Sequence, residues 1–144
     1  MPLKLSRHLK ILHLTAQHSD KSAVSSASKD LLSKLNFPYE CTDRNLWKQP
    51  LPTYNLDHVT SKFNLVRDPD SAKDQSVFES VSALTEELNK QDILLLSTPM
   101  WNLTVPYMVK HYIDIVVQPG SEYRSKYRGY RILCLSWNRD QTVI

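Results

Sequence analysis

The residues best suited to chemistry form a short loop, Pro99-Met100-Trp101-Asn102-Leu103, which directly follows an apolar run. The backbone amides of such a turn can bond the polar edge of a flat heterocycle, while Met100 and Trp101 can supply apolar walls. The alternative is a turn whose tryptophan only caps the core. The loop is therefore a candidate site for an aromatic ligand.

A second candidate segment is the polar loop and helix start from Thr15 to Ser26. The free backbone N–H groups of a helix N-terminus attract phosphate, and serine hydroxyls add donors. Ser22, Ser25 and Ser26 stand where they could do this, or they could simply be N-cap and surface serines. Because both glycines of the chain come after residue 119, any phosphate-binding loop here must work without glycine.

Two predicted elements position the first loop. The near-continuous apolar run after Asp92 predicts a strand that is covered on both faces, as in a parallel sheet. Pro99 ends this strand because it has no N–H to donate. A loop between a strand and a helix lies at the carboxyl edge of an open α/β sheet, where ligands bind. The helix is indicated by the spacing of Val105, Met108, Val109, Tyr112, Ile113 and Val116.

The rest of the chain continues this alternation of strands and helices. The patterns predict strands over residues 10–15, 39–42 and 131–137, and helices over residues 22–35 and 74–89. Residues 45–72, which Pro50, Pro52 and Pro69 interrupt, show the least regular pattern. We therefore expect one α/β domain over residues 1–144, with a doubly wound parallel sheet of four strands.

Composition and charge argue against several classes of function. The net charge is +3 and the basic residues are scattered, whereas a nucleic-acid-binding protein gathers them in a stripe. The nearest basic and aromatic stretch, residues 123–131, is expected to be a solvated loop. No run approaches the roughly 18 apolar residues of a membrane span, and residues 1–14 lack a signal-peptide core. We expect a cytoplasmic protein that binds neither nucleic acid nor membrane.

The cysteines, histidines and serines of the chain do not stand at the sequence spacings that are typical of metal sites or catalytic triads. Cys41 and Cys134 show no metal-ligand spacing, and Cys134 is expected to be a buried core thiol. The five histidines include no pair at metal spacing, so no metal site is predicted. Ser97 and Ser136 lack a nearby His and Asp, which leaves hydrolysis unsupported.

Taken together, these segments resemble a known group of flavoenzymes, the FMN-dependent NADH azoreductases and the related NAD(P)H quinone reductases of flavodoxin-like fold. The most specific part is Pro99-Met100-Trp101-Asn102 with the helix that follows it. The resemblance covers about residues 10–136. The other matching positions are Leu14-Thr15-Ala16, Leu46, Pro50-Leu51-Pro52, residues 88–92, Pro106, Lys110 and Tyr112-Ile113-Asp114.

The resemblance implies a homodimeric oxidoreductase with FMN as its cofactor. In that family FMN accepts a hydride from NADH or NADPH, and a quinone or azo compound then takes the electrons in the same site. Because FMN carries the chemistry, no catalytic side chain is predicted. Gln17 would lie beside the phosphate or ribityl chain. Ser25 matches the last serine of the family's phosphate loop, and Ser22 could take part if the register slips by one. The first loop would contact the flavin ring. The residues expected to hold FMN are Gln17, Ser22, Ser25, Pro99, Met100, Trp101, Asn102 and Leu103.

The chain also departs from the family pattern. The family's Ser-x-Ser reads Ala23-Val24-Ser25, and the stretch Trp137-Asn138-Arg139-Asp140 lacks the usual pair of glycines. From the resemblance, we expect the closing helix, the fifth strand and the final helix of the family to be absent. We therefore expect a domain truncated at its carboxyl end, with its last strand left as an exposed edge. The alternative function is a degenerate, non-catalytic flavodoxin-like remnant that acts through protein contacts.

Overall fold

The computed structural model describes residues 8–117 and 131–137 of the chain. Its four strands are β1 (Leu9–Thr15), β2 (Tyr39–Asn45), β3 (Ile93–Pro99) and β4 (Arg131–Trp137). All three pairings are parallel, and the strand order is β2-β1-β3-β4. The chain thus winds outward in both directions from β1, which confirms the predicted doubly wound α/β sheet of four strands. In such a sheet the switch point lies between β1 and β3, and ligands bind at its carboxyl edge.

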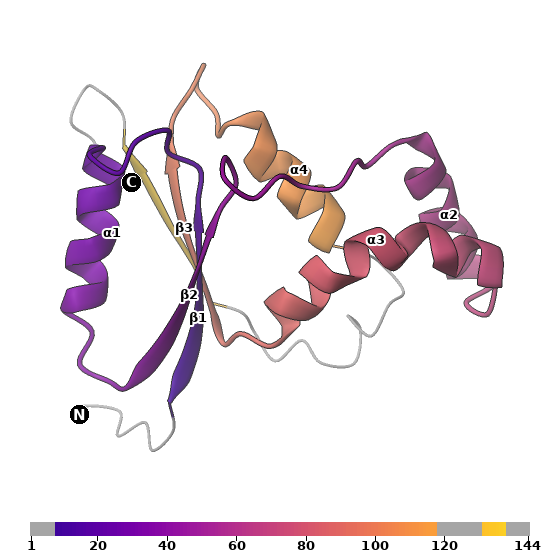
Figure 1. Cartoon of the computed structure of the whole chain (residues 1–144), viewed down its shortest axis with the longest axis horizontal. Coiled ribbons are helices and arrows are strands. Elements are labelled where there is room, and N and C mark those ends of the chain that lie inside the picture. The colour runs from indigo at the N-terminus through magenta and orange to yellow at the C-terminus, as the bar shows by residue number, and fades with distance from the viewer. Residues whose placement is uncertain (1–7, 118–130, 138–144) are drawn as a thin grey trace.

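Helices cover the sheet on both sides (Figure 1). Helix α1 (Ala23–Ser33) lies on one side and packs against β3 and β4. Helices α3 (Ala72–Asn89) and α4 (Tyr107–Val116) lie on the other side and pack against each other. Helix α2 (Leu56–Arg67) packs on α3 and extends away from the sheet. The fold therefore has three layers: α1, the sheet, and a layer of α3 and α4, from which α2 extends.

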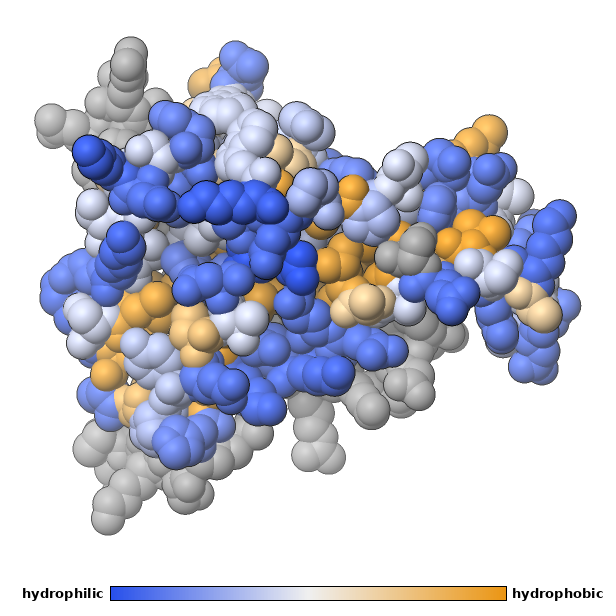
Figure 2. All heavy atoms as spheres, viewed as in Figure 1, coloured by the Kyte–Doolittle hydropathy of each residue, from blue (hydrophilic) through white to orange (hydrophobic). Residues whose placement is uncertain are grey.

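The main core lies between the sheet and the α3–α4 layer. Alternate residues of β1 and β3 point into it, and α3 and α4 contribute their apolar faces. Figure 2 shows apolar residues gathered where α3 and α4 meet and continuing toward α2. Burying each large aliphatic side chain contributes roughly 1.5–3 kcal/mol, so this layer holds most of the stability. Central members are Leu12, Leu14, Leu94, Leu96, Val81, Leu84, Val109, Tyr112 and Ile115.

The strand that leads into the first candidate loop follows its prediction closely. Leu94, Leu95 and Leu96 are all buried, so both faces of β3 are covered, as its apolar run indicates. Pro99 is its last residue. The last strand, β4, has the predicted bounds, and α1 begins one residue after its N-cap, Ser22. These elements were predictable because each has a strong local pattern.

The interpretation of residues 45–72 as irregular is wrong, because α2 occupies twelve of them. Asn55 caps this helix: its Oδ1 accepts from the backbone N–H of Asp57 at 3.1 Å and of His58 at 3.3 Å. The His58 ring in turn bonds the backbone N–H of Asn55 at 3.3 Å. This is a capping box with histidine in the place usually held by Glu or Gln, which is why the sequence pattern hides it. The prolines flank α2 and do not interrupt it.

Several expectations concern residues outside the described part of the chain. They include the two glycines, most of the basic stretch 123–131, and the stretch after Trp137 that lacks glycine. The side chain of Cys134 is also outside it. Among the described residues, no helix has both the length and the apolar character needed to cross a bilayer.

Candidate functional site

The ends of β1, β2 and β3 meet at one edge of the sheet. The backbone N–H of Ala16 donates to the carbonyl of Ser97 at 2.9 Å, and the N–H of Leu46 donates to the carbonyl of Thr15 at 2.9 Å. The loops that follow these three strands lie along the same edge (Figure 1). The two segments singled out in the sequence, the serine-bearing loop before α1 and the loop after β3, therefore start side by side.

The loop after β3 is a tight reverse turn. The N–H of Trp101 donates to the carbonyl of Thr104 at 2.8 Å, and the N–H of Thr104 donates back at 3.0 Å. Between them, Asn102 has φ of 50° and Leu103 has φ of 64°, the left-handed values of a type I′ turn. Asparagine tolerates this region, whereas leucine at such an angle costs roughly 1–3 kcal/mol.

The strain at Leu103 is not offset by burial, because the side chain is 90% exposed. Strained residues with exposed side chains tend to cluster at ligand sites, where the backbone shape itself is needed. Pro99 and Met100 are half-buried at the base of the turn, and Trp101 is 38% exposed above them. The turn therefore offers backbone amides, a thioether and an indole at the surface.

A second tryptophan, Trp47, joins this site from the loop after β2. Its ring lies against that of Trp101, with centroids 5.8 Å apart and planes tilted by 49°. Its Nε1 donates to the carbonyl of Ala16 at 2.8 Å. Trp47 thus connects the loop after β1 to the loop after β3. The sequence analysis missed it, although its place two residues after the end of a strand could have pointed to the same edge.

The serines at the start of α1 divide into different roles. Ser22 is the N-cap, and its Oγ accepts from the backbone N–H of Ser25 at 3.1 Å. Ser25 is buried and Ser26 is exposed. The N-cap interpretation is thus confirmed for Ser22. A cap of this kind satisfies one of the four free N–H groups of a helix start, and the helix dipole still favours an anion there.

Gln17 lies in the loop after β1, directly after Ala16 and before the start of α1. Its side chain is only 5% exposed, and its Oε1 is buried without a hydrogen-bond partner among the described residues. A buried acceptor left unpaired costs roughly 1–3 kcal/mol. A ligand that brings a hydroxyl or N–H donor to Gln17 would recover that energy.

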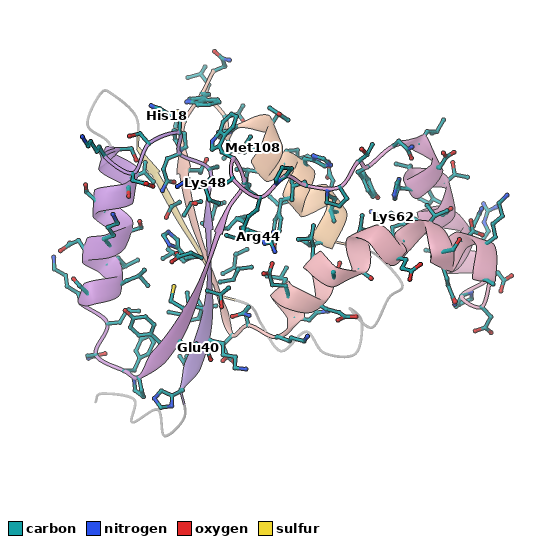
Figure 3. All side chains as sticks on the ribbon, viewed as in Figure 1. His18, Glu40, Arg44, Lys48, Lys62 and Met108 are labelled. Carbon is teal, nitrogen blue, oxygen red and sulfur yellow. The ribbon has the colours of Figure 1, made fainter. Side chains whose placement is uncertain are left out.

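One cationic side chain, that of Lys48, lies close to this edge. Lys48, in the loop after β2, is 3.7 Å from Asp20 in the loop after β1, measured from Nζ to Oδ2. Figure 3 shows His18 and Lys48 on neighbouring segments at the top of the sheet. Both are exposed. The Lys48 ammonium can attract an anionic ligand toward the start of α1 without being buried itself.

The expectation that Ser97 lacks a nearby His and Asp is wrong, because the fold brings His13 and Asp43 close to it. Nε2 of His13 lies 2.8 Å from Oγ of Ser97, and Nδ1 of the same ring lies 2.7 Å from Oδ1 of Asp43. The three residues come from β3, β1 and β2, so only the strand register brings them together. Ser97 is nevertheless fully buried within a strand, where its hydroxyl cannot reach a substrate, so hydrolysis gains no support.

Cys41 lies beside this group on β2. Burial, and secondly the charge of Asp43, raise the pKa of the Cys41 thiol to about 11. The thiol is therefore protonated near neutral pH. Its ordinary nucleophilicity is suppressed, which separates it from the reactive cysteines of catalytic sites.

The chain matches the model of a protein family described as "Flavodoxin-like fold" over residues 9–139. Among curated relatives, it is 35% identical over 107 residues to an FMN-dependent NADH:quinone oxidoreductase of Beijerinckia indica, covering 72% of this chain and 52% of that protein. It is 37% identical over 78 residues to the protein of the same name from Ruegeria pomeroyi, covering 53% and 38%. The chain thus spans about half the length of the relatives it matches, or less.

Solved structures give the same fold. An azoreductase from Bacillus anthracis superposes with a TM-score of 0.67 at 19% identity, over 89% of this chain and 68% of that one. An NAD(P)H:quinone oxidoreductase from Methanothermobacter marburgensis superposes with a TM-score of 0.60 at 23% identity, over 90% and 66%. At such identities the likeness concerns the fold alone. Because the family model matches residues 9–139, which are nearly the whole chain, the chain belongs to the flavodoxin-like fold family.

Proposed function

We propose that this chain is an FMN-dependent oxidoreductase, or the FMN-binding part of one, that passes a hydride from NADH or NADPH to quinones or azo compounds. The relatives named FMN-dependent NADH:quinone oxidoreductase support this activity. A structure similar in fold, an FMN-dependent NADH-azoreductase from Bacillus anthracis, is described as a complex with FMN. The single observation on this chain that carries the proposal is the buried, unpaired Oε1 of Gln17 in the loop after β1, whose first residue, Ala16, is hydrogen-bonded to Ser97 of β3.

The residues at the carboxyl edge suit the parts of FMN. FMN has a phosphate, a ribityl chain that bears hydroxyl donors, and a flat ring with a polar edge. A ribityl hydroxyl is the kind of donor that the unpaired acceptor of Gln17 requires. The start of α1 suits a phosphate, and the exposed turn after β3 offers backbone amides and apolar walls to a ring.

In this proposal each segment has its own task. Gln17 holds the ribityl chain, and Ser22 and Ser25 place the start of α1 against the phosphate. The turn seats the ring through Pro99, Met100, Trp101, Asn102 and Leu103. When bound, FMN would supply the two-electron chemistry between the nicotinamide donor and the quinone or azo acceptor. The protein's contribution is to position the ring and to keep its surroundings apolar.

We further propose that the active form is a homodimer. The support is the resemblance to the azoreductase and quinone reductase family together with apolar side chains left exposed on α4, among them Tyr107 and Ile113. Analytical ultracentrifugation of the full chain with FMN should give the mass of two chains. A monomer that binds FMN and reduces a quinone would refute the proposed dimer, but it would not contradict the proposed oxidoreductase activity.

The cofactor is tested by titrating FMN into the full chain while following flavin fluorescence and the melting temperature. We expect fluorescence quenching that saturates at one FMN per chain and a rise in melting temperature. Asn102→Gly, which keeps the positive φ but removes the side chain, should weaken binding several-fold. Asn36→Ala, at the opposite edge of the sheet before β2, is the matched control and should bind FMN normally.

Two results would reject the proposal in whole or in part. One is the absence of both quenching and thermal stabilisation, which would favour a non-catalytic remnant that acts through protein contacts. The other is equal FMN affinity in Asn102→Gly, Asn36→Ala and the unmodified chain, which would reject the side chain of Asn102 as one that holds the ring.

A further inference from the structure

Three side chains with metal-ligating atoms meet on the face of the sheet opposite the main core. Arg44 of β2 points to the α3 side, where it bonds Glu87 through two nitrogens at 2.6 and 3.0 Å (Figure 3). Because successive residues of a strand point to opposite faces, Cys41 and Asp43 share the other face. His13 of β1 is the register partner of Asp43. The pairing register of β1 and β2 therefore places the three side chains next to one another.

Their donor atoms are close enough to share one ion. An imidazole nitrogen of His13, Sγ of Cys41 and a carboxylate oxygen of Asp43 all lie within 4.8 Å of one another. Around a tetrahedral zinc ion, with bonds of about 2.0–2.3 Å, such atoms lie roughly 3.3–3.7 Å apart. The Nδ1–Oδ1 separation of 2.7 Å must therefore open slightly and the separations from sulfur must shorten. Rotations of the three side chains on the two paired strands would have to supply both changes.

The remaining nitrogen of His13 is already held in the way that a ligating histidine requires. Nε2 lies 2.8 Å from Oγ of Ser97, which is fully buried. With Nδ1 on a cation, Nε2 would carry the proton and donate it to Ser97. Ligating histidines almost always donate their second N–H in this manner, which fixes the ring orientation and the tautomer.

The group has one side open to solvent. His13 is buried, Cys41 is half-buried, and the side chain of Asp43 is 75% exposed. A cation can therefore enter from the Asp43 side, and water can complete its coordination. A cation would also supply the positive charge that a thiolate at Cys41 needs in this half-buried position.

We propose that His13, Cys41 and Asp43 form a binding site for a divalent cation of the zinc type, with Ser97 as the residue that positions His13. The ligand types decide the choice of metal. One sulfur, one nitrogen and one oxygen suit zinc, whereas calcium and magnesium prefer sets made of oxygen atoms. The bound cation ties β2, the edge strand beside β1, to the centre of the sheet. The proposal is independent of FMN.

The test uses the full chain, freed of metals by a chelator and titrated with Zn²⁺ and, in parallel, with Co²⁺ as a spectroscopic probe. We expect one Zn²⁺ per chain, a rise in melting temperature, and a dissociation constant of roughly 1 µM or lower. With Co²⁺ we expect the near-ultraviolet charge-transfer band of a thiolate ligand. Cys41→Ser should abolish this band, whereas Cys134→Ser, the change at the chain's other cysteine, should leave it in place.

Three further variants separate a metal ligand from a residue that only lies near the site. Asp43→Asn keeps the size of the side chain but loses the charge, and it should weaken Zn²⁺ binding at least about tenfold. Asp70→Asn, in the turn between α2 and α3, is the matched control and should leave binding unchanged. Ser97→Ala should weaken binding while keeping the sulfur band. The site is refuted if binding is not saturable at one ion per chain, if the sulfur band survives Cys41→Ser, or if Asp43→Asn and Asp70→Asn bind Zn²⁺ equally.

Discussion

The indole ring of Trp47 lies against the indole ring of Trp101, although the two residues follow different strands. Trp47 also donates from Nε1 to the backbone of Ala16, so one side chain contacts the loops after β1 and β3 together. Both indoles remain partly exposed, at 42% and 38%. This pair physically links the two segments that we propose to hold FMN.

Trp47→Phe tests that link. Phenylalanine keeps a ring beside Trp101 but loses the hydrogen bond to Ala16, whose net value is about 1 kcal/mol. We expect a lower free energy of unfolding by about that amount in urea, and weaker FMN binding because the two loops are less firmly joined. Unchanged stability and unchanged FMN affinity would show that the bond at 2.8 Å has no structural role.

Leu103→Gly should stabilise the protein in the absence of FMN. Glycine adopts the φ of 64° without a steric penalty, and the leucine side chain that it replaces is almost fully exposed. We expect the free energy of unfolding to rise by about 1 kcal/mol in urea denaturation. Leu103→Ala is the control, since alanine keeps the strain and should give no gain. A loss of stability in Leu103→Gly would mean that the exposed side chain makes contacts that stabilise the turn.

Gln17→Leu should separate stability from cofactor binding. Replacing the amide, whose Oε1 is buried and unpaired, by an apolar side chain of similar size removes the penalty at Oε1, so the chain without FMN should be at least as stable as before. FMN affinity should fall about tenfold because the acceptor for a ribityl hydroxyl is gone. Thermal melts with and without FMN measure both quantities. Equal FMN affinity in Gln17→Leu would remove Gln17 from the site.

Asp74 should make the packing of α3 against α2 sensitive to acid. The hydroxyl of Ser71, followed by that of Ser61, donates to this carboxylate and holds its pKa below the ordinary value of 3.8. Because the pKa is lower in the folded protein, Asp74 adds stability above pH 3.8, and this is lost as the pH falls through the folded value. Asp74→Asn should flatten the acid limb of the stability curve. An acid limb identical to that of the unmodified chain would contradict this role.

The sequence predicted the elements whose patterns are local. The apolar run from Ile93 to Leu96 favours a strand covered on both faces, and Pro99 ends it, so β3 and the loop after it could be predicted. Helix α2 could not be predicted in this way, because its N-terminal capping box uses His58 and its flanking prolines suggest a loop.

Contacts across the sheet were beyond the sequence for a different reason. His13, Asp43 and Ser97 are each unremarkable in their own segment. Their grouping depends on the pairing register of β1 with β2 and β3, which no local pattern specifies. The contact of Trp47 with Trp101 was hidden in the same way, since each tryptophan follows its own strand.

The proposed function is tested most directly by electron transfer through the full chain loaded with FMN under anaerobic conditions. NADH or NADPH should bleach the visible absorbance of the bound flavin, and a quinone should then restore it, with one donor oxidised for each quinone reduced. An FMN complex whose absorbance neither donor changes, or one whose bleached absorbance no quinone or azo dye restores, would contradict the proposed function.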